Sequence, residues 1–133
     1  MNAVFVDTSA LLALLNASDE NHARAASAFA KLRAAKSRLI STSFVLVETY
    51  ALVGRRLGLD AVRDLRVDFA PLLDVVWIDA PVHEAGLDLL LARRKRRLSL
   101  VDAVSFVVMS QGKIGDALAF DPHFEDEGFT LVR

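Results

Sequence analysis

The sequence contains no cysteine among its 133 residues, which excludes disulfide bonds, thiolate metal sites and a cysteine nucleophile. It has only three histidines, and because they are scattered along the chain a zinc site made of imidazole groups is unfavourable. No apolar run reaches the roughly 18–20 residues that a membrane-spanning helix needs. The lack of cysteine fits a reducing compartment, so we expect a soluble, cytoplasmic protein with no membrane contact.

Neither sign of charge predominates in this chain. Sixteen Lys and Arg side chains stand against 17 Asp and Glu, which gives a formal net charge of −1. Overall charge therefore does not identify a nucleic-acid-binding protein, and only the distribution of charge can. Proline and glycine are also few, with three and six residues, and no stretch rich in them divides the chain. We expect one domain spanning residues 1–133.

Short apolar runs alternate with amphipathic segments along the chain. The runs predict strands at Ala3–Asp7, Arg38–Ser41, Val75–Ile78, Ala117–Phe120 and Phe129–Val132. The amphipathic segments predict helices at Ser9–Leu15, Glu20–Lys36, Phe44–Leu57, Asp60–Leu72, Pro81–Arg97 and Ser99–Ser110. The first run lacks the basic start of a signal peptide, so it is better read as a buried strand. This alternation predicts an α/β fold with a mostly parallel sheet of about five strands covered by helices.

Two acidic residues follow predicted strands directly. Asp7 ends the first strand and precedes a helix, and Asp121 follows the fourth strand and precedes Pro122. Each has a simpler structural explanation, because Asp often caps a helix and Asp-Pro often begins a turn. The carboxyl ends of parallel strands are nevertheless where an α/β sheet gathers its ligands. Both residues are therefore candidate site residues.

Glu48 interrupts a strongly apolar helix, between Phe44 and Leu52. The pattern predicts that this helix is buried on almost every side. An ionised carboxylate held there needs a cation, a metal ion or a raised pKa, because its burial without a partner costs several kcal/mol. A salt bridge to Arg55 or Arg56 is the structural alternative.

Asp102 lies in the first turn of another apolar helix. The spacing Ser99-x-x-Asp102 also matches a capping box, which would explain the residue without any function. Its carboxylate would nevertheless face the same cleft as that of Glu48. Four clustered carboxylates repel one another, and a hard divalent cation with oxygen ligands is the usual resolution. Asp7, Glu48, Asp102 and Asp121 therefore form a hypothetical Mg²⁺ or Mn²⁺ site.

Four segments of the chain resemble the acidic motifs of PIN domains. Their order, their near-complete span from the first strand to the last and the Asp-x-His-Phe ending resemble VapC toxins. The segments are Val6-Asp7-Thr8-Ser9-Ala10-Leu11, Phe44-Val45-Leu46-Val47-Glu48, Leu98-Ser99-Leu100-Val101-Asp102-Ala103-Val104-Ser105-Phe106 and Ala119-Phe120-Asp121-Pro122-His123-Phe124. Any one motif is weakly specific, but all four occur in order over one short domain. The resemblance implies a PIN-like three-layer α/β/α fold.

The same resemblance implies a chemistry and a set of partners. The chain would be an endoribonuclease in which Asp7, Glu48, Asp102 and Asp121 hold Mg²⁺ or Mn²⁺ and a metal-activated water cuts the RNA. The hydroxyls of Thr8, Ser9 and Ser105 would orient carboxylates or waters. As the toxin of a toxin–antitoxin pair, it would bind a VapB-like antitoxin and form a homodimer. Asp116 and Asp126 remain alternatives for the fourth acidic position.

The strongest basic run consists of Arg93, Arg94, Lys95, Arg96 and Arg97. Cations at the end of a helix are favoured by the helix dipole, so this run has a purely structural explanation. It also lies five residues before Asp102, where it would bind the phosphates that flank a cleavage site. The acidic segment Glu125–Glu127 is best explained as a solvated turn.

Three other functions compete with that of a toxin. An aspartyl-phosphate enzyme is disfavoured, because Asp7-Thr8-Ser9 has no second acid two residues on and no lysine follows a later strand. A non-catalytic RNA- or protein-binding PIN module has little reason to keep Glu48 in an apolar helix. A PIN ribonuclease that matures RNA, rather than a toxin, has the same motifs and stays open.

Overall fold

The computed structural model describes residues 2–133, which contain one five-stranded sheet. Its strands are β1 (Ala3–Val6), β2 (Arg38–Thr42), β3 (Asp74–Val76), β4 (Asp116–Leu118) and β5 (Thr130–Val132). They lie in the order β3-β2-β1-β4-β5, and every neighbouring pair is parallel. The expected α/β fold with about five strands is confirmed, and the sheet is entirely rather than mostly parallel.

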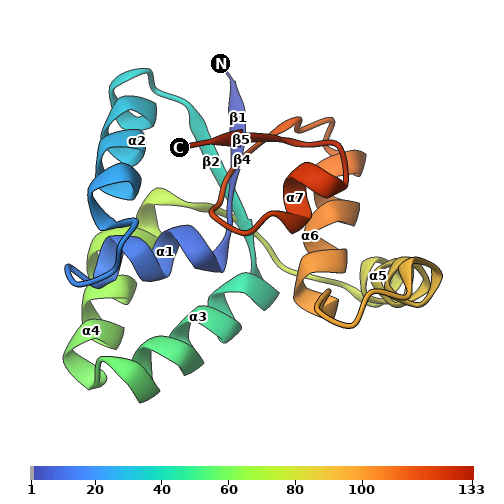
Figure 1. Cartoon of the computed structure of the whole chain (residues 1–133), viewed down its shortest axis with the longest axis horizontal. Coiled ribbons are helices and arrows are strands. Elements are labelled where there is room, and N and C mark those ends of the chain that lie inside the picture. Colours follow the sequence, from blue (N-terminus) through green and yellow to red (C-terminus); the bar gives the residue numbers. More distant parts are fainter. Residues whose placement is uncertain (1) are drawn as a thin grey trace.

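Helices cover both faces of this sheet. They are α1 (Thr8–Leu15), α2 (His22–Ala34), α3 (Ser43–Arg56), α4 (Leu59–Asp64), α5 (Ala80–Arg93), α6 (Leu100–Gln111) and α7 (His123–Asp126). Figure 1 shows α1 and α2 on one side of the strands and α6 and α7 on the other, which is the expected three-layer arrangement. No helix within residues 2–133 has the length and apolar character needed to cross a membrane.

The central strand β1 is the best-buried part of the sheet. Val4, Phe5 and Val6 are each at most 2% exposed, because helices cover the strand on both faces and this favours a continuous apolar run. From β1 the chain first builds outward through β2 and β3, and then continues on the other side through β4 and β5. The carboxyl ends of β1 and β4 therefore flank the point where the strand order reverses, which is the usual ligand position in such sheets.

The predicted helix at residues 60–72 is helical throughout, but its geometry changes along its length. The α-helix α4 ends at Asp64, residues Leu65–Phe69 form a π-helical turn, and Ala70–Leu72 form a 3₁₀ turn. Pro71 explains the end of the segment, because it has no N–H to donate to the carbonyl four residues earlier. The sequence pattern therefore predicted the position of this segment but not its hydrogen bonding.

The helix predicted at residues 81–97 ends earlier than expected. Helix α5 stops at Arg93, and Arg94 adopts a left-handed conformation with φ of 55°. The chain must reverse there, because α5 packs closely against α6. A Cβ atom at Gly86 would lie 2.5 Å from Cγ2 of Val104, so this contact requires glycine. The close packing fixes α6, which carries Asp102.

Candidate active site

Four carboxylates from four parts of the chain line one cavity of about 250 Å³ at the carboxyl end of the sheet. Asp7 follows β1, Glu48 lies on α3, Asp102 lies on α6, and Asp121 lies beyond β4. Thr8, Ser9, Leu12, Arg97 and Ser99 complete the lining. The structure thus brings together the four acidic residues that the sequence singled out, at the point where the strand order reverses.

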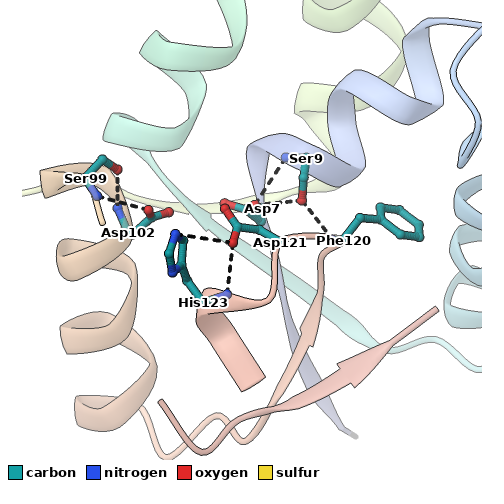
Figure 2. Close-up of polar contacts among 7 residues, drawn as sticks. All are labelled: Asp7, Ser9, Ser99, Asp102, Phe120, Asp121 and His123. Carbon is teal, nitrogen blue, oxygen red and sulfur yellow. Dashed lines mark hydrogen bonds and ion pairs between the residues drawn. The ribbon is translucent and has the colours of Figure 1, made fainter. Parts of the chain in front are cut away.

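Asp7 is held rigidly between the sheet and helix α1. It caps α1, because its Oδ2 accepts hydrogen bonds from the Ser9 backbone N–H at 3.2 Å and from the Ser9 hydroxyl at 2.8 Å. The Ser9 Oγ in turn accepts from the backbone N–H of Phe120 at 2.9 Å, which ties the start of α1 to the segment after β4 (Figure 2). The capping explanation for Asp7 is therefore correct, and it fixes the carboxylate in the cavity.

Burial raises the pKa of Asp7 to about 7, and the negative charge of Asp102 adds to this effect. The hydrogen bonds from Ser9 act in the opposite direction, because they stabilise the ionised form. A buried carboxyl with this pKa is only partly ionised near neutral pH unless a cation is close. The environment of Asp7 therefore favours either a proton or a positively charged ligand.

Glu48 lies at the edge of the cavity rather than inside a fully buried helix. Val45 and Thr49 are fully buried, but the neighbouring Val47 is 67% exposed, so the prediction of burial on almost every side is wrong. No ion pair in residues 2–133 involves Glu48, and the alternative of a salt bridge to Arg55 or Arg56 is thereby contradicted. Burial still raises the pKa of Glu48, and the negative charges of Asp102 and Asp121 raise it further. A hydrogen bond from the Thr8 hydroxyl lowers this pKa but does not cancel the increase.

Asp102 forms the capping box that the sequence indicates. The Ser99 N–H donates to Asp102 Oδ2 and the Asp102 N–H donates to Ser99 Oγ, both at 3.1 Å. The residue is nonetheless only 9% exposed and faces the cavity (Figure 2). Burial raises the pKa of Asp102, and the charge of Asp121 contributes in the same direction against the Ser99 N–H. Capping and site geometry are therefore compatible here, as at Asp7.

Asp121 is more exposed than Asp7 and Asp102. Its side chain is 32% exposed, and its Oδ1 accepts a hydrogen bond from the backbone N–H of His123 at 2.9 Å. The same oxygen lies 3.8 Å from the His123 Nε2 atom. The turn through Pro122 thus places the Asp121 side chain in the lining of the cavity and the His123 imidazole in the adjoining groove, which Asp121 also lines.

The donor set of this cavity is suited to a hard divalent cation. Four carboxylates provide oxygen atoms, and three of them have a raised pKa because burial and mutual repulsion disfavour their charge. Among the described residues that line the cavity, Arg97 is the one with a permanent positive charge. Oxygen-rich, electrostatically strained sites of this kind suit Mg²⁺ or Mn²⁺. The residues present therefore fit a divalent metal ion.

Comparison with known proteins identifies the family of this chain. A model of the PIN domain matches residues 4–129, and the chain is 38% identical to the 23S rRNA-specific endonuclease VapC20 of Mycobacterium tuberculosis over 132 residues, which is 98% of both chains. This chain is a PIN-domain protein of the VapC family. The PIN-like fold and the family that the four acidic motifs indicated are thereby confirmed.

Solved structures agree with this assignment. The crystal structure of Mycobacterium tuberculosis VapC20, described as a sarcin-ricin loop cleaving toxin, has a TM-score of 0.84 and 34% identity, covering 96% of each chain. DNA-bound VapBC from Salmonella typhimurium has a TM-score of 0.70 and 14% identity, covering 98% of this chain and 97% of its own. FitAcB from Neisseria gonorrhoeae has a TM-score of 0.69 and 14% identity, covering 98% of this chain and 96% of its own. The last two likenesses show the fold alone.

Some residues considered from the sequence lie away from the cavity of this PIN domain. The Ser105 hydroxyl is fully buried and donates to the Val101 carbonyl at 2.8 Å, so it does not orient an acidic side chain. Asp116 begins β4 and lies at the opposite end of that strand from Asp121. Asp126 is exposed at the end of α7 and does not line the cavity. Of the three alternatives for the fourth acid, Asp121 is the one that reaches the site.

The basic run of the VapC protein divides into residues with different surroundings. Arg93 binds Glu127 through two hydrogen bonds, Nε to Oε1 at 2.6 Å and Nη2 to Oε2 at 3.2 Å. Arg94, Lys95 and Arg96 are exposed in the connection between α5 and α6. Arg97 alone among the five lines the acidic cavity, and it also lines the neighbouring groove that contains Phe120 and His123. The run is therefore not one uniform phosphate-binding surface.

Sequence reasoning gave His123 no role in the site, although the residue is part of the Asp-x-His-Phe ending that resembles VapC toxins. That ending is the signal that could have identified it. One ligand atom from each of Asp102, Asp121 and His123 lies within 4.8 Å of the others. The distance to Asp102, 21 positions away along the sequence, depends on how α6 packs and could not be read from the sequence.

Proposed function

We propose that this chain is a metal-dependent RNA endonuclease that acts as the toxin of a toxin–antitoxin pair. Asp7, Glu48, Asp102 and Asp121 are its catalytic, metal-binding residues. The observation that carries the proposal is the convergence of these four carboxylates on one cavity with so little positive charge to balance them. Burying several carboxylates close together is energetically unfavourable, and a bound cation would compensate for their repulsion.

In this proposal the carboxylates bind the ion, and neighbouring serine residues orient the carboxylates. Mg²⁺ or Mn²⁺ held by the four carboxylates would supply the positive charge that polarises a phosphodiester and lowers the pKa of a water molecule. Ser9 fixes the Asp7 carboxylate through two hydrogen bonds, and Ser99 fixes that of Asp102 through the capping box. Such fixed ligands reduce the reorganisation that the reaction requires.

The substrate that we infer is the large-subunit ribosomal RNA, cut at its sarcin-ricin loop. The support is the activity of the Mycobacterium tuberculosis relative, a 23S rRNA-specific endonuclease, together with 38% identity over nearly the whole of both chains. By similarity to the family, the cut leaves a 5′-phosphate and a 3′-hydroxyl. This substrate lies in the cytoplasm, where we place the protein.

The partners that we infer are a VapB-like antitoxin and a second copy of this chain. Solved complexes of related fold pair such a domain with an antitoxin, as in VapBC from Salmonella typhimurium. A basic side chain from the antitoxin among the four carboxylates would compete with the metal ion for the same negative charge. Inhibition would then need no change of fold.

Production of this chain in a bacterial host should slow growth and create new 5′ ends in 23S rRNA. The Asp102→Asn variant, made at equal abundance, should do neither, because it lacks a metal-binding charge. Growth curves and sequencing of RNA 5′ ends after induction measure both effects for the wild type and the variant. Normal growth with intact ribosomal RNA would contradict the toxin function, and new ends confined to precursor RNAs would favour RNA maturation instead.

Within the basic run, we propose that Arg97 holds a phosphate next to the scissile bond. The Arg97→Gln variant should weaken RNA binding for all sequences alike. It should also make the plot of log affinity against log salt concentration less steep, by the amount expected for the loss of about one phosphate contact. The matched control is Arg96→Gln, which removes the same charge from an exposed neighbour that does not line the cavity. Both are measured in the non-cleaving Asp102→Asn background. Equal losses in the two variants would contradict a specific role for Arg97.

A further inference from the structure

The imidazole of His123 lies between two of the acidic side chains. Its Nε2 is 3.8 Å from Asp121 Oδ1, and ligand atoms of His123, Asp102 and Asp121 all lie within 4.8 Å of one another. Figure 2 shows the ring below the Asp102 carboxylate and beside that of Asp121. Nε2 is thus the ring nitrogen that faces Asp121, whereas Nδ1 is buried and has no hydrogen-bond partner within residues 2–133.

The backbone holds this imidazole in place. The His123 N–H donates to Asp121 Oδ1 at 2.9 Å, so the two side chains belong to one tight turn. The next residue, Phe124, is fully buried, with its ring centroid 5.1 Å from that of Phe106 and 6.0 Å from that of Phe5. The His123 side chain itself is only 17% exposed. Its position is therefore set by the core rather than by solvent.

The spacing fits a shared cation better than a direct hydrogen bond. A separation of 3.8 Å between Nε2 and Oδ1 is too long for a hydrogen bond, whose usual N···O distance is about 2.7–3.2 Å. Two ligand atoms that each lie about 2.1 Å from one ion are at most about 4.2 Å apart. The 3.8 Å separation lies below this limit, so the Nε2 and Oδ1 atoms are close enough to bind one ion together.

We propose that His123 is a nitrogen ligand that joins Asp102 and Asp121 on the metal ion, and that it makes this chain prefer Mn²⁺ to Mg²⁺. The inference rests on the proposed metal-dependent function and names a ligand and an ion that the four acidic motifs do not specify. Mg²⁺ is bound almost entirely through oxygen, whereas imidazole is a good ligand for first-row transition ions. A mixed carboxylate and imidazole site therefore discriminates between the two ions.

The test is electron spin-echo spectroscopy of the purified full chain loaded with Mn²⁺ alone. Nitrogen coordination gives ¹⁴N modulation, which should change to the ¹⁵N pattern when the histidines are labelled with ¹⁵N. The modulation should be lost in His123→Asn and His123→Gln but retained in His83→Asn, a partly exposed histidine away from the cavity. Calorimetric titration should show the preference for Mn²⁺ over Mg²⁺ falling by at least about tenfold in the two His123 variants.

The outcomes separate this inference from the proposed function. Mn²⁺ that binds the wild-type chain, fails to bind Asp102→Asn, and yet shows no ¹⁴N modulation would overturn the role of His123 and leave the acidic metal site standing. An unchanged preference for Mn²⁺ in both His123 variants, with circular dichroism showing an intact fold, would overturn it as well. If the wild-type chain binds neither ion, the proposed function fails together with this inference.

Discussion

Replacing Asp102 or Asp7 with Asn should reduce RNA cleavage by at least about 100-fold and leave the fold intact. Loss of a residue that only supports a metal ligand costs about 10–100-fold, so loss of a ligand charge should cost no less. The amide oxygen of Asn can still accept the hydrogen bond from Ser99 at position 102 and those from Ser9 at position 7. The caps of α6 and α1 should therefore survive. Initial rates on a labelled RNA, with circular dichroism of each variant, measure the effect.

Asp116→Asn and Asp126→Asn are the matched controls for this loss. Each removes one carboxylate charge from the same C-terminal part of the chain, but Asp116 begins β4 and Asp126 is exposed beyond the cavity. Both variants should keep a cleavage rate within a few-fold of the wild type. Full activity in Asp7→Asn or Asp102→Asn would contradict the catalytic assignment, and inactivity of Asp116→Asn or Asp126→Asn would show that the site extends beyond the described cavity.

Without metal, the free energy of unfolding of the wild-type chain should decrease as the pH rises from about 4 to about 7. A carboxyl whose pKa is raised by folding binds its proton more tightly in the folded state. Its stabilising contribution is complete below the unfolded pKa of 3.8 and is lost as the pH passes through the folded pKa of about 7. For Asp7 this shift corresponds to roughly 4 kcal/mol, at about 1.4 kcal/mol per pKa unit. Glu48 and Asp102 act in the same direction.

The Asp7→Asn variant isolates this effect. It has no titrating group at position 7, so in EDTA its stability relative to the wild type should rise by roughly 4 kcal/mol between pH 4 and pH 8. Urea unfolding at each pH measures the difference. Mn²⁺ should then stabilise the wild-type chain at pH 8 more than it stabilises the variant, because the ion replaces the lost proton. Parallel pH profiles for the two proteins would contradict the raised pKa of Asp7.

Much of the site could be predicted from the sequence because three of its acids sit at element boundaries. Asp7 and Asp121 follow strands of one parallel sheet, and Asp102 begins an apolar helix. The alternation of strands and helices is enough to bring such positions to one edge of the sheet. The capping roles of Asp7 and Asp102 did not argue against function, since a capping hydrogen bond also fixes the direction of the carboxylate.

Other features depend on contacts between segments far apart in sequence. The Ser9 hydroxyl joins Asp7 to the backbone of Phe120, 111 residues away, and His123 approaches Asp102 only through the packing of α6. The basic run looked uniform, yet Glu127 binds Arg93 while Arg97 reaches the cavity. The exposure of Val47 was also missed, because the apolar pattern of α3 does not show which side lacks a covering element. Periodicity reports what a segment can bury, and packing decides what it does bury.

The most direct test of the central claim is cleavage of a synthetic sarcin-ricin loop RNA by the purified wild-type chain, first with Mn²⁺ or Mg²⁺ and then with excess EDTA. We expect one new 5′-phosphate end within the loop, complete loss of cleavage in EDTA, and recovery when the divalent ion is restored. Cleavage that persists in EDTA, or a chain that leaves the RNA intact at every divalent ion concentration, would contradict a metal-dependent nuclease at these four carboxylates.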